Sequence, residues 1–314
     1  MNLKKVLKII LPLILGGFLV WYSLSKVSID TLLKYFQNAN YWWIALGLFF
    51  GILSHLSRAY RWKYLLEPMG YKPDFGNSTM AVLIAYLVNY AVPRAGEVSR
   101  AAVMANYEDI PFEKGFGTIV AERIADLLMM LGIIVITLFV QFDFIYQLLT
   151  KNFDPIKIGI LLVGLVIAFI VFTRYVKKAQ SGLGLKIKNF IVGLIEGATS
   201  IFKMKNKWAF IFHTVFIWLM YVAMFWATIP AINNLHVPFG AVLIGFIAGG
   251  FSIAATNGGI GLYPVAVAGA FALFAIPDEP ANAFGWIMWT AQTLMIIIFG
   301  GLAFVLLPVY NKNK

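Results

Sequence analysis

The amino-acid sequence predicts an all-α polytopic membrane protein with six full spans and two opposed hairpins. Of its 314 residues, 61% are hydrophobic and 12% are charged, whereas soluble proteins average about 25% charged residues. Several apolar stretches approach or exceed the roughly 20 residues that a helix needs to cross the bilayer. Two further apolar regions are broken by glycine and proline, and such paired breaks indicate a transport site near the bilayer midplane.

Six stretches have the length and composition of a full span. In chain order they are Leu7–Leu24, Trp42–Ser57, Gly117–Gln141, Ile156–Thr173, Trp208–Pro230 and Trp286–Leu307. The first resembles a signal peptide because lysines precede it, but its long apolar core has no small-residue cleavage site. We therefore expect it to remain as a span.

The two interrupted regions are predicted to be hairpins. The first occupies residues 78–105, around Pro93, and the second occupies residues 239–276, around Gly258 and Gly259. From length alone, each region fits one full span, two short spans, or a re-entrant hairpin that enters and leaves by one face.

The positions of lysine and arginine favour a turn back, or a double crossing, in both regions. Cytoplasmic loops accumulate these residues, and two spans after the basic N-terminus return Arg58 and Arg61 to the cytoplasm. The most basic loop, residues 174–207, joins them there only if the first region does not cross once. The same treatment of the second region places Asp278 and Glu279 outside.

This threading predicts one membrane domain, residues 1–314, in the plasma membrane with both termini in the cytoplasm. The hairpins then open from opposite faces, as in an inverted-topology repeat, and their tips can approach each other. Residues 183–205 carry apolar side chains at helical spacing among lysines. They predict an amphipathic helix in the cytoplasmic interface, either a structural brace or a contact for anionic lipids.

Six charged residues fall in predicted membrane segments, three on the first hairpin and three on the following span. On insertion scales each costs at least about 2.5 kcal/mol, so we expect them to have a role. They form either a salt-bridge network that pins the hairpin to the span, a ligand site, or both. They are Arg94, Glu97, Arg100, Glu122, Arg123 and Asp126.

A phosphate or phosphodiester head group suits these residues, and a carboxylate would fit almost as well. Arginine offers a planar, bidentate donor fork, and a helix that begins near Gly96 adds oriented backbone N–H groups. Glycines in the second hairpin permit close backbone approach and positive φ angles. The remaining predicted substrate contacts are neutral: Asn89, Asn257, Gly258, Gly259 and Tyr263.

Other classes of site are not expected. The chain has no cysteine, which excludes disulfides and thiolate chemistry. Its three histidines lie far apart without metal-ligand spacing, so we expect no metal and no cofactor. The net charge of +11 follows from cytoplasmic loops rather than from nucleic-acid binding.

Three motifs carry a resemblance to a known family. Residues 89–100 read NYAVPRAGEVSR, residues 120–126 read VAERIAD, and residues 257–261 read NGGIG. In this order they resemble the transmembrane region of lysylphosphatidylglycerol synthases and their stand-alone flippase-like relatives. That family usually has a proline before the second glycine pair and an arginine–glutamate pair after it, whereas here Asn257, Tyr263 and Pro264 stand there.

The resemblance implies lipid handling. In bifunctional members this region is thought to move an aminoacylated phospholipid between leaflets after a soluble domain makes it, and other relatives are tied to isoprenoid-linked sugars or hopanoids. The sequence extends only a few residues past its last predicted span, so we expect no aminoacyl transfer from it.

The sequence therefore predicts a non-enzymatic flippase or transporter for an anionic phospholipid or a lipid-linked intermediate. The main alternative is an intramembrane transferase for a lipid-linked donor, with Glu97, Glu122 or Asp126 as general base. A third alternative is an assembly partner with no ligand of its own. The expected partners are the lipid substrate and anionic lipids at the cytoplasmic face, and a homo-oligomer stays open.

Overall fold

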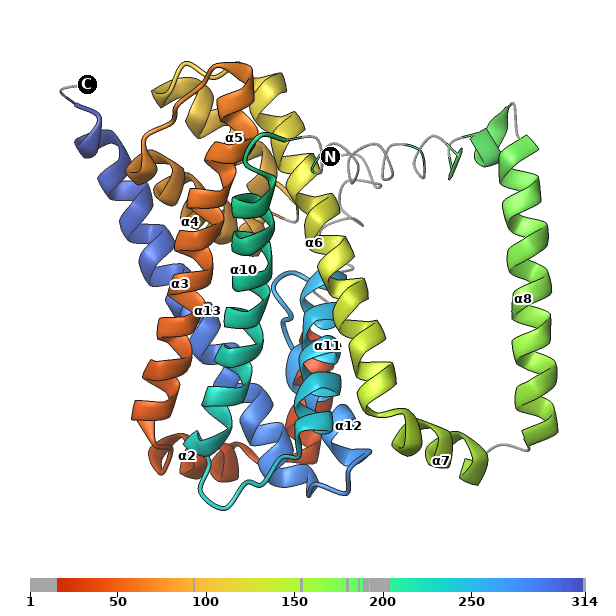
Figure 1. The fold of residues 1–314 in the computed structure, drawn as a ribbon. Helices are drawn as coiled ribbons and strands as arrows, with labels where there is room; N and C mark the ends of the chain where they lie inside the picture. Colours follow the sequence, from red (N-terminus) through yellow and green to blue (C-terminus); the bar gives the residue numbers. More distant parts are fainter. Residues whose placement is uncertain are drawn as a thin grey trace, which may run out of the picture. The chain divides into compact units, whose positions relative to one another are not determined.

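The computed structural model describes residues 16–92, 94–152, 155–178, 181–185, 187–188, 192, 201 and 204–312. All regular structure among these residues is helical, as the all-α prediction required (Figure 1). The chain divides into two compact units. Unit 1 comprises Met1–Glu122 and Trp208–Lys314, unit 2 comprises Arg123–Lys207, and the boundary falls inside one helix.

Unit 1 contains residues 16–26, which are helical, and most of the named helices. These are α2 (Ile29–Gln37), α3 (Tyr41–Leu66), η1 (Glu67–Met69), α4 (Phe75–Ala91), α5 (Gly96–Tyr107), α10 (Lys207–Thr228), η2 (Ile229–Ala231), α11 (Phe239–Ala255), α12 (Leu262–Ala272) and α13 (Asp278–Tyr310). Helix α6 (Phe112–Val140) begins in unit 1 and continues into unit 2, which also holds α7 (Phe142–Asn152) and α8 (Pro155–Lys178).

Three described helices are long and apolar enough to cross a membrane, namely α6, α10 with η2, and α13. Helices α2 and α3 pass the same test only as a pair, and they are bent by 85° at their junction. The predicted span at residues 156–173 lies within α8. The predicted interfacial helix at residues 183–205 falls largely outside the described residues.

The second predicted span extends further than expected. The sequence places its end at Ser57, but α3 continues without a break to Leu66 and buries Arg58 and Arg61. Charged residues do not by themselves stop a helix, and arginine is a good helix former. The helical segment ends only after Pro68, where Gly70 adopts φ +88°.

Helix α13 is the axis along which both predicted hairpins are arranged. Its 33 residues span about 50 Å at 1.5 Å per residue. The α4–α5 pair lies at one end of unit 1 and the α11–α12 pair at the other (Figure 1). The C-terminal half of α13 contacts α4, since Gly300 lies against Leu83 and Leu87.

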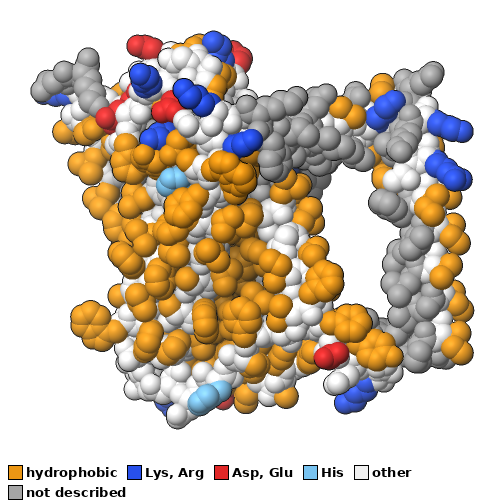
Figure 2. Space-filling model, viewed as in Figure 1, with side chains coloured by type: hydrophobic (Ala, Val, Ile, Leu, Met, Phe, Trp, Pro, Cys, Tyr) orange, Lys and Arg blue, Asp and Glu red, His pale blue; other side chains and the backbone are white. Residues whose placement is uncertain are grey.

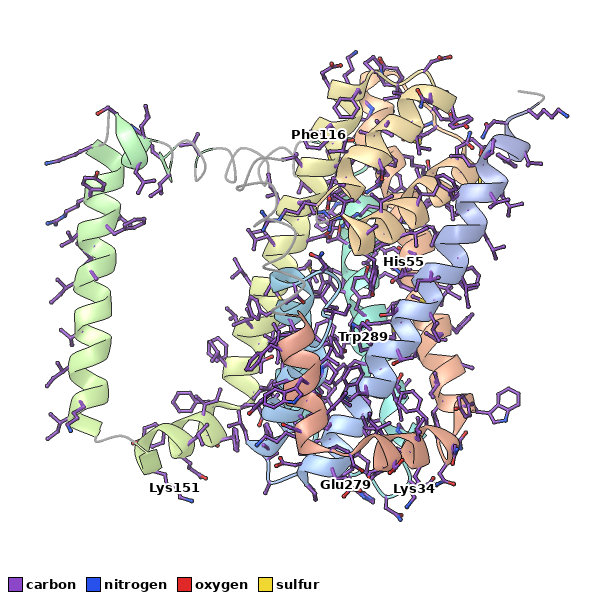
Figure 3. All side chains as sticks on the ribbon, turned by 180° about the vertical axis from the view of Figure 1, so that it is seen from behind. Lys34, His55, Phe116, Lys151, Glu279 and Trp289 are labelled. Carbon is purple, nitrogen blue, oxygen red and sulfur yellow. The ribbon has the colours of Figure 1, made fainter. Side chains whose placement is uncertain are left out.

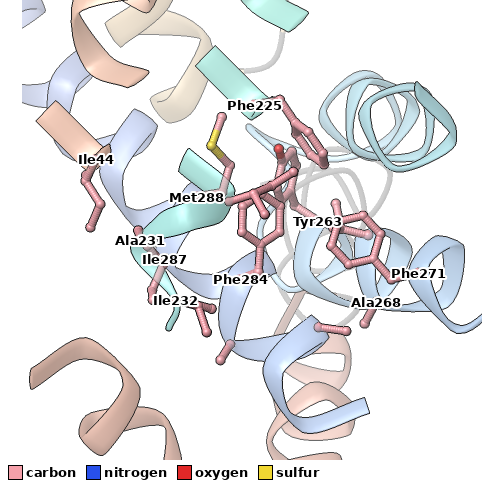
Figure 4. Packing of buried hydrophobic residues seen from close by; sticks show 14 of the residues in the cluster. Ile44, Phe225, Ala231, Ile232, Tyr263, Ala268, Phe271, Phe284, Ile287 and Met288 are labelled. Carbon is pink, nitrogen blue, oxygen red and sulfur yellow. The ribbon is translucent and has the colours of Figure 1, made fainter. Parts of the chain in front are cut away.

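The N-terminal half of α13 contacts α12. Gly285 lies directly against the backbone of Pro264, and a Cβ there would clash. Phe284 stacks on Phe271 with ring centroids 5.4 Å apart, and Phe225 of α10 meets both rings edge-on. These rings form the centre of the main apolar cluster (Figure 4). Aromatic pairs of this kind contribute about 0.5–1.5 kcal/mol each beyond the burial of their surface.

The exterior of unit 1 is apolar along most of its length. Figure 2 shows hydrophobic side chains over this face, with most of the visible lysine, arginine, aspartate and glutamate side chains at one end. That end is where α4 begins and α13 finishes, because Asn77 of α4 hydrogen-bonds Asn311 in both directions, at 2.8 and 2.7 Å. A soluble protein would not expose so large an apolar surface.

Candidate functional site: a buried arginine cluster

Glu122 lies at the centre of a buried charged cluster in unit 1. Its Oε2 atom accepts a hydrogen bond from Nη1 of Arg100 at 2.5 Å, and its Oε1 atom lies 3.5 Å from Nε of Arg61. The positive charge of Arg58 also acts on it. Each of these four residues is at most 2% exposed. Fully buried charges in the described part of unit 1 thus comprise three arginines and one carboxylate.

Helix α3 supplies two of the arginines, and these two are three residues apart. Arg58 and Arg61 therefore share one face of the helix. Arg61 donates from Nη1 to Oγ1 of Thr214 on α10 at 2.9 Å, and its guanidinium lies 5.1 Å from the ring centroid of Phe210. Both contacts come from α10, which fixes the orientation of the Arg61 side chain and limits the side-chain entropy that ligand binding would cost.

Trp62 orients the third arginine. The guanidinium carbon of Arg100 lies 3.7 Å from the centroid of the fully buried Trp62 ring, and Nε1 of Trp62 donates to Oγ1 of Thr118 on α6 at 2.8 Å. A cation over an indole face is stabilised by the ring quadrupole. Helices α3, α5 and α6 are therefore joined around one ion pair.

The start of α5 brings Arg100 to this place. The helix begins at Gly96, as predicted, and the N–H of Gly96 donates to Oδ1 of Asn89 at 2.8 Å. A Cβ on Gly96 would clash with the carbonyl oxygen of Ala85, so only glycine lets α5 approach α4 this closely. The side-chain oxygen of Asn89 is therefore engaged in a hydrogen bond within the protein. Arg100 lies one turn after the start of α5.

Arg94 does not share that helix with Glu97 and Arg100. Their three-residue spacing predicts that a helix beginning near Gly96 carries all three close together, but Arg94 lies two residues before the first residue of α5. Arg94 is exposed and has φ +61°, a conformation that no helix contains. Pro93 lies outside the described residues. Glu97 is half-buried in the first turn of α5, where the helix dipole stabilises a negatively charged carboxylate.

Two predicted site residues pair with each other in unit 2. Nη1 of Arg123 lies 3.6 Å from Oδ2 of Asp126, one turn further along α6. The Arg123 side chain is 44% exposed, so this pair has access to solvent or head groups that Glu122 lacks. The structure thus joins four of the six predicted charges as two ion pairs, Arg100–Glu122 and Arg123–Asp126.

The tip of the second hairpin contains the predicted left-handed glycines. Gly258, Gly259 and Gly261 have φ of +65°, +82° and +68°. The carbonyl of Gly258 accepts a hydrogen bond from Nε1 of Trp289 on α13 at 2.8 Å. A Cβ on Gly258 would collide with the ring of Tyr90. Because Tyr90 lies near the end of α4, the tips of the two hairpins contact each other.

Two other predicted residues of this hairpin have different surroundings. Asn257 is half-buried beside the glycines. Tyr263 is 3% exposed and belongs to the main apolar cluster, where its ring fills the space left by Gly249. The ring of Tyr263 therefore has a packing role in this conformation.

Sequence reasoning missed Arg58, Arg61, Trp62 and His55 as site residues. His55 is 5% exposed and lies inside the bundle, as does Trp289 of α13 (Figure 3). His55 stacks on Tyr86 with ring centroids 4.5 Å apart. The available signal was the absence of any helix breaker between residues 57 and 66, which places these side chains on a continuous helix. Among the described residues no cluster of three or more histidine or acidic side chains forms a metal site.

Comparison with known proteins decides the family. The family model described as "Lysylphosphatidylglycerol synthase TM region" matches residues 9–301. The chain belongs to this family. The chain is similar to the UPF0104 membrane protein MJ1595 of Methanocaldococcus jannaschii, with 24% identity over 332 residues that cover 96% of each chain.

A second relative matches only in part. The glycosyltransferase AglD of Haloferax volcanii is 34% identical over 83 residues, which cover 26% of this chain and 13% of AglD. No solved structure matches. The resemblance seen in the three motifs is thus confirmed at the level of the lysylphosphatidylglycerol synthase transmembrane-region family.

Proposed function

We propose that this chain is a flippase or transporter that moves an anionic phospholipid or a lipid-linked intermediate between leaflets. The observation that carries the proposal is the buried cluster of Arg58, Arg61 and Arg100 around Glu122. Burying several charges is costly even when they are paired, and within membrane segments ionisable side chains mark substrate pathways. A head-group phosphate offers the bidentate acceptor that three guanidinium groups suit.

The proposed topology follows from the same geometry. We assign six full spans and two re-entrant hairpins, α4–α5 and α11–α12, to one membrane domain in the plasma membrane with cytoplasmic termini. The charged end of unit 1 would face the cytoplasm, as the positive-inside rule requires. Non-helical backbone at membrane depth must be enclosed by protein, and the contact of Gly258 with Tyr90 and Trp289 supports that requirement.

In this proposal the structure corresponds to a closed state. Because the cluster is buried, a lipid head group reaches it only when neighbouring helices separate. In this closed state the Glu122 carboxylate occupies the position of the lipid phosphate, and it holds Arg61 and Arg100 in place until the lipid binds. Arg94, Arg123, Asp126 and Asn257 remain proposed contacts along the route, and anionic lipids and a second copy of the chain remain proposed partners.

A liposome assay tests this function. The purified chain is reconstituted with fluorescent phosphatidylglycerol, phosphatidylcholine or polyprenyl phosphate, and the fraction of label that an external reductant quenches is followed over time. We expect translocation of the anionic lipids. Arg100→Lys should slow it about tenfold, since losing one bidentate contact corresponds to about 1.4 kcal/mol.

Lys72→Gln is the matched control, because Lys72 is an exposed cation outside the cluster. It should translocate lipid at the wild-type rate. Absence of translocation by the folded wild type across the panel, or full activity in Arg100→Lys and Glu122→Gln, would contradict the proposal.

The alternative is an intramembrane transferase that uses a lipid-linked donor. The partial match to a glycosyltransferase supports it, and Glu97, Glu122 or Asp126 would serve as general base. Incubation of the purified chain with polyprenyl-linked sugar donors, followed by mass spectrometry of the lipids, separates the two functions. A new lipid product that Glu122→Gln fails to form would favour the transferase.

A further inference from the structure

An open groove lies between α3 and α10 in unit 1. It has a volume of about 270 Å³, and its walls are mainly apolar or aromatic side chains, among them Leu53, Phe212 and Phe216. Phe212 is 63% exposed, so the groove opens on the outer surface of the unit. Neither α3 nor α10 covers the groove.

The spacing of small and large residues explains the groove. At one end of the two helices, Gly47 lies so close to Met224 and Thr228 that an added Cβ would clash. Three turns further along α3, the facing positions on α10 carry phenylalanine instead, and the space between the helices is open. Close contact at one end and large aromatic rings at the other leave a concave apolar surface.

The polar end of the groove adjoins the arginine cluster. Ser57 Oγ and His213 Nδ1, which both line it, are hydrogen-bonded at 2.8 Å. One turn later on α3, Arg61 donates to Thr214, the residue after His213. Arg61 in turn lies 3.5 Å from Glu122. The Ser57–His213 pair that lines the groove is therefore followed, one turn later on α3 and one residue later on α10, by the Arg61–Thr214 pair of the cluster.

A further cation lies at the rim. Nζ of Lys63 is 3.7 Å from the ring centroid of Tyr60, which lines the groove. Apolar walls, a hydrogen-bonding pair and cations at one end together match a lipid, with its hydrocarbon chain along the walls and its phosphate at the charged end.

We infer that this groove holds a hydrocarbon chain of the anionic lipid substrate, so that the lipid reaches the arginine cluster sideways from the bilayer between α3 and α10. The inference rests on the proposed function. It adds an access route and assigns Ser57 and His213 to the place where the polar and apolar parts of the lipid meet.

Photo-labelling tests the groove directly. The full chain is reconstituted with phosphatidylglycerol or phosphatidylcholine bearing the same diazirine-labelled acyl chain, irradiated and digested, and the labelled peptides are identified by mass spectrometry. We expect the anionic probe to label the peptides containing Leu53, Phe212 and Phe216 about tenfold more than the zwitterionic probe, a preference of 1.4 kcal/mol.

The exposed apolar surface around Phe304 and Val305 of α13 provides the internal control, because any bilayer lipid contacts it. Both probes should label it equally. Leu53→Trp, which fills the groove, should remove the anionic preference there, whereas Phe304→Trp should preserve it. Equal labelling of the groove by the two lipids in the wild type overturns the inference.

Labelling reports occupancy and needs no translocation, so the two proposals fail separately. Preferential labelling of the groove without lipid translocation would count against the flippase and leave the groove standing. Translocation without preferential labelling would leave the flippase standing and remove this route.

Discussion

The contact between the two hairpin tips predicts that Gly258→Ala destabilises the protein. Gly258 has φ +65°, and a Cβ built on it would overlap the ring of Tyr90. The substitution therefore strains the backbone of one hairpin and pushes it away from the other. Both effects arise at the point where Trp289 holds the Gly258 carbonyl.

The size of the effect follows from these two contributions. A left-handed conformation costs a non-glycine residue about 1–2 kcal/mol, and inserting a methyl group into a packed site costs about 1–3 kcal/mol. Loss of chain entropy in the unfolded state returns about 0.4–1 kcal/mol. We therefore expect the free energy of unfolding to fall by about 1–5 kcal/mol.

The measurement is unfolding of the purified chain in mixed micelles with increasing SDS, followed by circular dichroism. Gly269→Ala is the matched control, because Gly269 lies inside α12 and nothing surrounds the added Cβ. It should leave stability unchanged or raise it by up to about 1 kcal/mol.

A double-mutant cycle identifies the cause. Tyr90→Ala removes the ring that the Gly258→Ala methyl group would meet, so the double variant should be more stable than the sum of the single effects by at least about 1 kcal/mol. Wild-type stability of Gly258→Ala, or strict additivity with Tyr90→Ala, would refute the tip-to-tip contact.

Three other predictions concern the arginine cluster. Glu122→Gln removes the carboxylate from among the arginines. It should lower the free energy of unfolding by about 3–5 kcal/mol, because the arginines of a buried ion pair are left without their partner. The same SDS titration measures this change, and wild-type stability would contradict the prediction. Gly96→Ala, whose methyl group would meet the Ala85 carbonyl, should cost about 1–3 kcal/mol and expose α5 to limited proteolysis, and unchanged cleavage kinetics would argue against this packing. Trp62→Phe and Thr118→Val each break the same hydrogen bond, so each should cost at least about 1 kcal/mol, and fully additive costs in the double variant would show that the bond contributes nothing.

The first hairpin shows which features the local sequence pattern predicts and which it does not. Glycine at position 96, polar neighbours and flanking apolar arms predict a break followed by a helix, and α5 does begin at Gly96. The pattern could not place Arg94, because the left-handed turn that excludes it from α5 depends on how closely α5 approaches α4.

The charged residues of α3 show where pattern failed. A count of apolar residues ends the span at Ser57 and assigns Arg58 and Arg61 to a loop, whereas in the structure both are buried. Their burial depends on Glu122, which lies 61 residues beyond Arg61 in sequence, and on Thr214, which lies 153 residues beyond it. Hydropathy averages over neighbours in sequence and contains no information about such partners.

The sequence by itself determined the helical class, the positions of both glycine breaks and the family, because these depend on composition and on spacing along the chain. Only the tertiary structure decided which charges meet, that the two tips contact each other along α13, and that an apolar groove adjoins the arginines. The physical reason is that ion pairing and close packing act between side chains that folding brings together, whatever their separation in sequence.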